Sequence, residues 1–304
     1  MNTKDKLNII LNISGLTQVQ LAQRLKTSYP TVNSWINDRS KPRKKAIEKI
    51  DRFYFDLINK EFTEEDRLSE KKSLIFIKSK NYKNILKEIL NNSDIYEQFL
   101  LALTYNTNKI EGSTLTMDET KAIMFDNVGL SNKHIVEHLE VKNHEAALRY
   151  IFSSIKKIDQ NLILKLHSIL MNGILENAGQ YRKHPVRILG SNVPTANYLK
   201  IPELMNSLIK KVNSSDKDKI AHIAKIHSQF EQIHPFSDGN GRIGRLLTMI
   251  MLLYNNLPPA IIKQEKKRFY NSSLRKSQLI EDYVDLEEFI CDSIINGFKI
   301  IERK

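Results

Sequence analysis

The sequence predicts an all-α fold in two domains, and three observations support that prediction. The chain has 304 residues, enough for about two domains, and 41% of them are hydrophobic, enough for a sizeable core. Most segments place apolar residues at helical spacing, and no proline occurs between Pro42 and Pro185. Residues 1–60 carry twelve Lys or Arg and five Asp or Glu, a net charge of +7 out of +12 for the whole chain. A small basic domain therefore precedes a larger helical one.

The first predicted domain covers residues 1–55 and contains two short helices. Leu16 to Leu25 has the spacing of an amphipathic helix. Ser28 begins a second helix, with Pro30 in its first turn, where a missing N–H is tolerated. The second helix is expected to bury one stripe, made of Val32, Trp35 and Ile36.

This helix pair resembles the helix-turn-helix of the λ-repressor/Cro class. Lys26 stands at the turn where that class usually has glycine, and a side chain in the left-handed conformation there costs about 1 kcal/mol. The resemblance implies that residues 1–55 bind DNA, with polar residues in the major groove and basic residues on phosphates. A solvated basic face or a protein-docking module is the alternative. The predicted DNA contacts are Ser28, Tyr29, Thr31, Asn33, Arg39 and Lys41.

Residues 56–95 are predicted to be a helical linker, because they are rich in charge. The second domain is expected over residues 96–304, and it begins with a helix over 97–112 that Gly112 caps. Glu111 would then lie at the negative end of the helix dipole, where a carboxylate is disfavoured by roughly 0.3–1 kcal/mol unless a cation faces it. A cation is therefore expected beside Glu111.

One short segment departs from the helical pattern. Val186 to Leu189 is β-prone and lies between Pro185 and Gly190. We expect a small β-hairpin over residues 186–200. Its exposed edge could bind an extended peptide through main-chain hydrogen bonds, although an ordinary connecting hairpin fits the pattern equally well.

The most informative stretch runs from His234 to Arg245 and reads HPFSDGNGRIGR. Apolar residues recur at helical spacing from Ile243 onward, so a helix starts here. The first N–H groups of a helix have no intrahelical partner, and glycines let a ligand approach them closely. Loop and helix start are therefore predicted to bind an anion. A capped loop before a core helix is the alternative.

The side chains around these glycines suggest phosphate chemistry. Asp238 is a hard oxygen ligand suited to a phosphate-bound magnesium ion. Arg242 and Arg245 are three residues apart, on one helix face, and can clamp phosphates. His234 can accept a proton from an attacking hydroxyl near neutral pH.

Residues 234–245 resemble the signature of the Fic family, His-x-Phe-x-Asp/Glu-Gly-Asn-Gly-Arg-x-x-Arg, at every defined position. The resemblance implies transfer of AMP from ATP to a hydroxyl of a target protein, on an all-helical domain with a β-hairpin flap. It makes His234 the general base and Asp238 the Mg²⁺ ligand. The phosphates would be held by Gly239, Asn240, Gly241, Arg242 and Arg245. The related Doc branch transfers a terminal phosphate and departs from the Gly-Asn-Gly that this chain keeps.

Three further segments resemble parts of the same family. Gly179 to Arg182 and the residues after it resemble the approach to the flap, where Ile188 and Leu189 would contact the nucleotide. Residues 268–274 resemble the helix beside the adenine pocket and offer Tyr270, although an aromatic at helical spacing is more often a core residue. The third segment matches the inhibitory motif Ser/Thr-x-x-x-Glu-Gly/Asn with Thr107, Glu111 and Gly112.

The inhibitory motif implies that Glu111 pairs with Arg245 and keeps the γ-phosphate from binding productively. A glutamate solvated beside a glycine turn is the alternative. The sequence therefore predicts a self-inhibited protein adenylyltransferase with a DNA-binding head. Removal of AMP from a modified protein at the same site, or a DNA-binding regulator that only senses nucleotide, are the alternative functions.

Composition and cysteine usage bear on the environment of the protein. The single cysteine, Cys291, cannot form an internal disulfide, which fits a reducing cytoplasm. No run approaches the roughly 18 consecutive apolar residues of a membrane span, so no membrane association is expected. A homodimer is an expectation of the helix-turn-helix class, since such heads commonly read paired half-sites.

Overall fold

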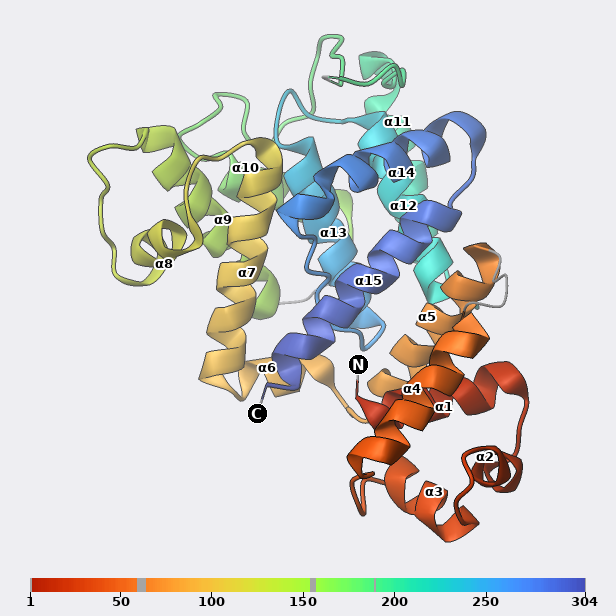
Figure 1. Ribbon diagram of the computed structural model, residues 1–304. Coiled ribbons are helices and arrows are strands. Elements are labelled where there is room, and N and C mark those ends of the chain that lie inside the picture. Colours follow the sequence, from red (N-terminus) through yellow and green to blue (C-terminus); the bar gives the residue numbers. More distant parts are fainter. Residues whose placement is uncertain (1, 59–63, 154–156, 189, 304) are drawn as a thin grey trace. The chain divides into compact units, whose positions relative to one another are not determined.

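The computed structural model describes residues 2–58, 64–153, 157–188 and 190–303 (Figure 1). Within these ranges all regular secondary structure is helical, which confirms the all-α prediction. The chain divides into two compact units, residues 1–78 and 79–304. The segment predicted as a linker, 56–95, does not stand apart from them. Its helix α5 (Glu64–Ser79) falls almost wholly in the first unit, and α6 (Ile85–Leu90) falls in the second.

The two helices predicted in the first domain are present, with caps that the sequence encodes. Thr17 accepts a hydrogen bond from the N–H of Gln20, whose side chain accepts from the N–H of Thr17 in return, a capping box. Ser28 caps the next helix, and Lys26 adopts the expected left-handed conformation, with φ 54°. The helices of this unit before α5 are α1 (Thr3–Ser14), α2 (Gln18–Arg24), α3 (Tyr29–Ile36) and α4 (Lys44–Ile58).

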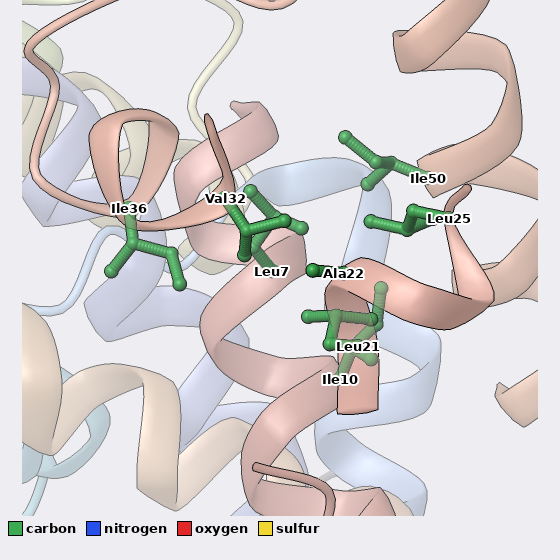
Figure 2. Close-up of a cluster of buried hydrophobic side chains, with 8 residues drawn as sticks. All are labelled: Leu7, Ile10, Leu21, Ala22, Leu25, Val32, Ile36 and Ile50. Atoms are coloured by element: carbon green, nitrogen blue, oxygen red, sulfur yellow. The ribbon is translucent and has the colours of Figure 1, made fainter. Parts of the chain in front are cut away.

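The core of the first unit is a compact aliphatic cluster (Figure 2). Helix α1 packs on α3 and on α4, and α2 packs on α3, and each of the four contributes side chains to the cluster. Trp35 packs against the cluster from its edge, partly buried. The buried members are Leu7, Ile10, Leu21, Ala22, Leu25, Val32, Ile36 and Ile50.

The second unit is built around one buried helix, α13 (Asn240–Tyr254), which packs on α12, α10 and α7. Its residues are buried almost all round, as is typical of a helix in the centre of a domain. Besides α6, the other helices described in this unit are α7 (Ser93–Glu111), α8 (Met117–Phe125), α9 (Ile135–Ser153), α10 (Gln160–Leu170), η1 (Tyr198–Lys200), α11 (Ile201–Val212), α12 (Lys219–Ile233), η2 (Gln264–Lys266), α14 (Lys267–Ile280) and α15 (Val284–Ile301). None of the helices in the described ranges is long and apolar enough to span a bilayer.

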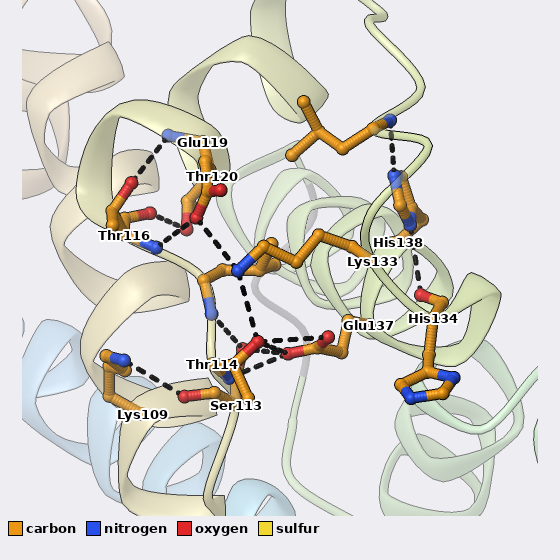
Figure 3. A network of polar contacts seen from close by, with 12 residues as sticks. Lys109, Ser113, Thr114, Thr116, Glu119, Thr120, Lys133, His134, Glu137 and His138 are labelled. Atoms are coloured by element: carbon orange, nitrogen blue, oxygen red, sulfur yellow. Dashed lines mark hydrogen bonds and ion pairs between the residues drawn. The ribbon is translucent and has the colours of Figure 1, made fainter.

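Helix α7 contains the predicted helix over 97–112 and ends as expected. Gly112 is left-handed, with φ 109°, and its N–H donates to the carbonyl oxygens of Asn108 and Lys109. The next residues are fastened to α9: Glu137 accepts hydrogen bonds from the side chain of Ser113 and from the N–H and hydroxyl of Thr114 (Figure 3). The position of the helix end, and with it of Glu111, is therefore fixed from both sides.

The predicted β-hairpin over 186–200 is wrong, because the described residues of this segment contain no strand. The Thr195 hydroxyl donates to the Val186 carbonyl at 2.7 Å. A side-chain hydrogen bond therefore joins Thr195 to Val186, where main-chain hydrogen bonds between two strands were expected. Pro194 offers no N–H to such a ladder, which disfavours strand pairing. Ile188 is half-buried at a turn, its carbonyl accepting from the N–H of Ser191, and Leu189 lies outside the described residues.

Candidate active site

His234 ends α12 in a strained conformation at the mouth of the site. Its φ is 50°, a left-handed value that is uncommon for residues other than glycine. Nδ1 lies 3.1 Å from the Glu231 carbonyl oxygen, which can only accept, so Nδ1 carries the proton and Nε2 is free to accept one. Burial lowers the pKa of His234, so the ring is neutral near pH 7 and can act as a base.

The loop that follows is closed from within by Asn240. Its side-chain oxygen accepts from the N–H of Phe236 at 2.8 Å, and its amide donates to the Phe236 carbonyl at 2.9 Å. Both polar atoms of the side chain thus bond within the loop, and the main-chain N–H of Asn240 is its group at the start of α13. Gly239, at the N-cap, has no side chain to occupy the first free N–H groups of α13. The start of α13 is therefore suited to binding an anion.

Side chains of other helices lie close to two glycines at the start of α13. A Cβ on Gly239, whose φ is 77°, would lie 2.9 Å from Sδ of Met171. A Cβ on Gly241 would lie 2.8 Å from Oε1 of Glu111 and 3.1 Å from Nη1 of Arg245. The Glu111 carboxylate therefore lies directly over the first turn of α13, next to its free N–H groups.

Arg242 is buried, only 2% exposed, yet one of its nitrogens has no partner. Nη1 donates to Oε1 of Glu140 at 2.7 Å, and Nη2 lies 3.8 Å from Oδ2 of Asp238. Nε is buried without a hydrogen-bond partner in the part of the chain that the structure describes. An orphaned guanidinium N–H beside a helix N-terminus favours an anionic ligand, since buried donors are rarely left unpaired.

Asp238 is the exposed acid of the site. Its side chain is 65% exposed, and Oδ1 accepts from the N–H of Gly239 at 2.6 Å. No group of three or more His, Cys, Asp or Glu side chains that could hold a metal ion occurs among the described residues. One exposed carboxylate next to the candidate anion site at the start of α13 still fits Mg²⁺, which usually takes one or two carboxylates together with phosphate oxygens.

The cation expected beside Glu111 is Arg245. Nη2 of Arg245 donates to the Glu111 carboxylate, and Nε donates to the hydroxyl of Thr107 at 2.7 Å. Burial alone would raise the pKa of Glu111, but the charge of Arg245 and its hydrogen bond outweigh burial and hold that pKa below its usual value. Both members of the pair are therefore ionised, and Glu111 occupies the guanidinium of Arg245, the second arginine of the signature.

Two residues that the sequence analysis missed hold this site in place. Glu140 binds Arg242 from α9, about a hundred residues away, and no motif marks it. His167 accepts the N–H of Gly179 at Nδ1, at 2.8 Å, and donates from Nε2 to the Asp238 carbonyl at 3.1 Å. The apolar stripe of α10 around His167, with Ile163, Leu166 and Leu170, could have indicated that this histidine is buried.

Tyr270, the residue predicted to lie beside the adenine, is buried in the second unit. The residue is 3% exposed, its hydroxyl is 2.7 Å from Nε2 of His227, and its ring stacks on Phe289 at 5.2 Å. Both the ring and the hydroxyl therefore have partners inside the domain, and the contact of Tyr270 with an adenine stays a prediction.

The predicted DNA contacts lie at the surface of the first unit. Ser28, Tyr29, Arg39 and Lys41 are exposed and Thr31 and Asn33 are half-buried, the Asn33 amide donating to Gln18 at 3.1 Å. A groove beside α3 and the start of α4 has a strongly basic lining that includes Lys26, Lys41, Arg43, Lys45 and Lys49. This surface suits a phosphate backbone.

Buried histidines of the second unit make its stability dependent on pH. Burial lowers the pKa of His144 to about 3 and those of His167 and His227 to about 4. Below pH 6.5 these three histidines bind protons in the unfolded chain but stay neutral in the folded protein. Each of them therefore lowers the free energy of unfolding by roughly 1.4 kcal/mol for every unit by which the pH falls. Burial raises the pKa of Glu231 to about 7, so this one glutamate has the opposite effect and raises the free energy of unfolding as the pH falls.

We therefore expect the free energy of unfolding to fall as the pH is lowered from 6.5 to 5. Urea denaturation of the full chain at several pH values measures it. An unfolding free energy that stays constant over this range would contradict the assignment of these histidines as neutral.

Two segments of the chain match known protein families. Residues 157–252 match the Fic/DOC family, and residues 10–55 match the helix-turn-helix family. The protein adenylyltransferase Fic of Drosophila melanogaster is 33% identical over 175 residues, 55% of this chain and 35% of that protein. The protein of the same name from Nematostella vectensis is 32% identical over 201 residues, 61% of this chain and 44% of that protein. The chain thus spans less than half the length of these curated relatives.

Solved structures share the fold. Fic-1 (residues 134 to 508) from C. elegans matches with a TM-score of 0.68 at 21% identity, covering 97% of this chain and 91% of that one. A Fic domain containing signaling protein from Bacteroides thetaiotaomicron matches with a TM-score of 0.66 at 24% identity, covering 76% of this chain and 97% of that one. At these identities the likeness concerns the fold.

Proposed function

Because residues 157–252 form a domain of the Fic/DOC family, we propose that the protein transfers AMP from ATP to a Ser, Thr or Tyr hydroxyl of a target protein or of itself. One observation carries the proposal. The start of α13 gathers a neutral histidine, an exposed carboxylate and an arginine with an unpaired Nε. The relatives named protein adenylyltransferase support it.

The reaction uses these groups in fixed roles. Nε2 of His234 takes the proton of the acceptor hydroxyl, whose oxygen attacks the α-phosphorus of ATP. The bond from the α-phosphorus to the bridging oxygen breaks, and pyrophosphate leaves. The free N–H groups of α13 and the guanidinium of Arg242 stabilise the charge on the phosphate oxygens, since phosphoryl-type transfer depends mainly on positioning and electrostatics. Magnesium held by Asp238 would neutralise part of the same charge.

Self-inhibition follows from the pairing of Glu111 with Arg245. Arg245 is the residue proposed to receive the γ-phosphate, and Glu111 already occupies it. The Glu111 carboxylate is ionised and lies over Gly241 at the helix N-terminus, so its negative charge also repels the triphosphate. The resting enzyme is therefore mostly inactive.

Removal of AMP from a modified protein is a second candidate activity. One observation favours it: an ionised Glu111 beside the phosphate site could align a water molecule for attack. Incubation with an AMP-modified protein distinguishes the two reactions, because only the removing activity releases free AMP and restores the unmodified mass.

We also propose that residues 1–55 bind DNA through α3 and the basic groove beside it. Replacing Lys41 with glutamine is expected to lower the slope of log affinity against log salt by about 1, because one phosphate contact is lost. Fluorescence anisotropy with duplex DNA over a salt series measures the slope, and Lys87→Gln, an exposed lysine of the second unit, is the matched control. Equal slopes for the Lys41 and Lys87 variants would contradict the contact. Paired half-sites in selected DNA would indicate a homodimer.

A further inference from the structure

Glu231 is a buried glutamate of α12 whose carboxyl group has an unpaired oxygen. The residue is 7% exposed, and Oε1 is buried without a hydrogen-bond partner in the part of the chain that the structure describes. Oε1 lies against α13, where a Cβ on Gly244 would be only 2.2 Å from it. Buried polar atoms are rarely left unpaired, so this carboxyl group is a candidate for a functional role.

Two carboxyl groups lie over the first turns of α13, each against a glycine. Oε1 of Glu111 is 2.8 Å from the Cβ position of Gly241, and Oε1 of Glu231 is 2.2 Å from that of Gly244. Positions three apart on a helix are neighbours on its surface, with Cβ positions about 5–6 Å apart. Nη1 of Arg245 is 3.1 Å from the same Cβ position of Gly241. One guanidinium therefore lies near two glutamates that come from different helices, α7 and α12, both of which pack on α13 (Figure 1).

The charges of these groups are coupled. Burial is the main cause that raises the pKa of Glu231 to about 7, while the charge of Arg245 acts against burial and that of Glu111 adds to it. Tyr270 of α14 also lies in this field, since Glu231 adds to the effect of burial in raising its pKa. His227, one turn earlier on α12, is neutral because burial lowers its pKa to about 4. A group with a pKa close to 7 changes its charge at neutral pH when a neighbouring charge is removed.

We propose that Glu231 is a positioning residue, the second counter-ion of Arg245, which replaces Glu111 when the inhibitory contact opens. The side chain of Arg245 is only 9% exposed, and a buried cation that loses its charged partner is strongly destabilised. Loss of Glu111 from the guanidinium therefore favours the ionised form of Glu231, which releases its proton to solvent. The negative charge then holds Arg245 at the start of α13 until the γ-phosphate of ATP binds. This last step rests on the proposed function, whereas the change of counter-ion does not.

NMR titration of the carboxyl carbons in the full chain tests the change of counter-ion, with the Glu231 signal assigned through its own bonded atoms. The pKa of Glu231 is expected to fall by about one pH unit or more in Glu111→Gln, which removes the charge and keeps the shape of the side chain. Glu145→Gln is the matched control, because Glu145 is a buried glutamate with its own partner, Arg149. It should leave the pKa of Glu231 at the wild-type value. A pKa that does not change in Glu111→Gln would overturn the proposal.

Melting temperatures of single and double variants at pH 7 give a second test. Glu231→Gln keeps the shape of the neutral form and cannot ionise, so the double variant leaves Arg245 without either counter-ion. Its loss of melting temperature is expected to exceed the sum of the two single losses by about 2–4 °C. Additive losses, as expected when Glu111→Gln is combined with Glu145→Gln, would contradict the proposal. If Glu231→Gln alone does not fold, the titration still decides, because it needs no variant of Glu231.

Proton uptake tests the step that involves the nucleotide. Binding of the γ-phosphate to Arg245 should return Glu231 to its neutral form. The Glu111→Gly protein is therefore expected to take up more protons on binding ATP and magnesium at pH 7 than the same protein with Glu231→Gln. Calorimetry in two buffers of different ionisation enthalpy measures the uptake, and equal values would exclude the positioning role toward the nucleotide. If the Glu111→Gly protein binds no ATP, the proposed function fails, while the titration and the melting temperatures still decide whether Glu231 is the second counter-ion.

Discussion

Replacing Glu111 with glycine is expected to raise the rate of AMP transfer by roughly ten- to a hundredfold. The side chain that is removed is an ionised carboxylate hydrogen-bonded to Arg245, whose side chain is 9% exposed. A hydrogen bond to a charged group is worth about 1.5–3 kcal/mol, and the triphosphate no longer has to break it. Initial rates of label transfer from α-labelled ATP, to the protein itself and to candidate targets, measure the effect.

A matched control separates loss of this contact from a general effect of glycine at a helix end. Glu281 follows the last residue of α14 in a left-handed conformation, with φ 57°, and is exposed. Glu281→Gly should leave the rate of AMP transfer unchanged. Equal rates for the Glu111 variant and the wild type would remove the inhibitory role from Glu111 and leave the contact as a structural ion pair.

Replacing His234 with alanine in the same background is expected to lower the rate of transfer by about 10²–10⁴-fold. The ring is neutral, its Nδ1 proton faces the Glu231 carbonyl, and Nε2 is the atom that can accept the hydroxyl proton. The affinity for ATP should not change, because His234 makes no contact with the phosphates in this mechanism. Single-turnover rates together with calorimetric ATP binding test both statements.

His134→Ala is the control for this prediction, since His134 is exposed on the loop before α9. Its rate should equal that of the parent protein. Retained transfer in the His234 variant would mean that another group takes the proton, and the base would have to be reassigned.

The sequence predicted those parts of the site that lie close together in the chain or follow a helix rule. The end of α7 at Gly112 and the need for a cation beside Glu111 both follow from cap chemistry and the helix dipole, and Arg245 fills that place. The left-handed Lys26 was expected from the resemblance to the helix-turn-helix class, which usually has glycine at this position. In each case the local conformation restricts which side chain can stand there.

Contacts between distant helices could not be predicted in this way. Glu140 meets Arg242 only because α9 packs near the start of α13, and nothing in a single sequence relates the two positions. The prediction of the β-hairpin was wrong for a similar reason. The residues from Val186 onward favour a strand, but side-chain hydrogen bonds from Arg182 and Thr195 hold the segment in place of main-chain hydrogen bonds between strands. Tertiary contacts override such local preferences.

Labelled ATP tests most directly the central claim that the start of α13 holds a triphosphate for attack at its α-phosphorus. The Glu111→Gly protein is incubated with magnesium and ATP labelled at either the α- or the γ-phosphorus, and the protein-bound label is then counted. We expect covalent label from α-labelled ATP, none from γ-labelled ATP, and an added mass of one adenylate. Label from the γ-position instead, or no label from either, would contradict the claim.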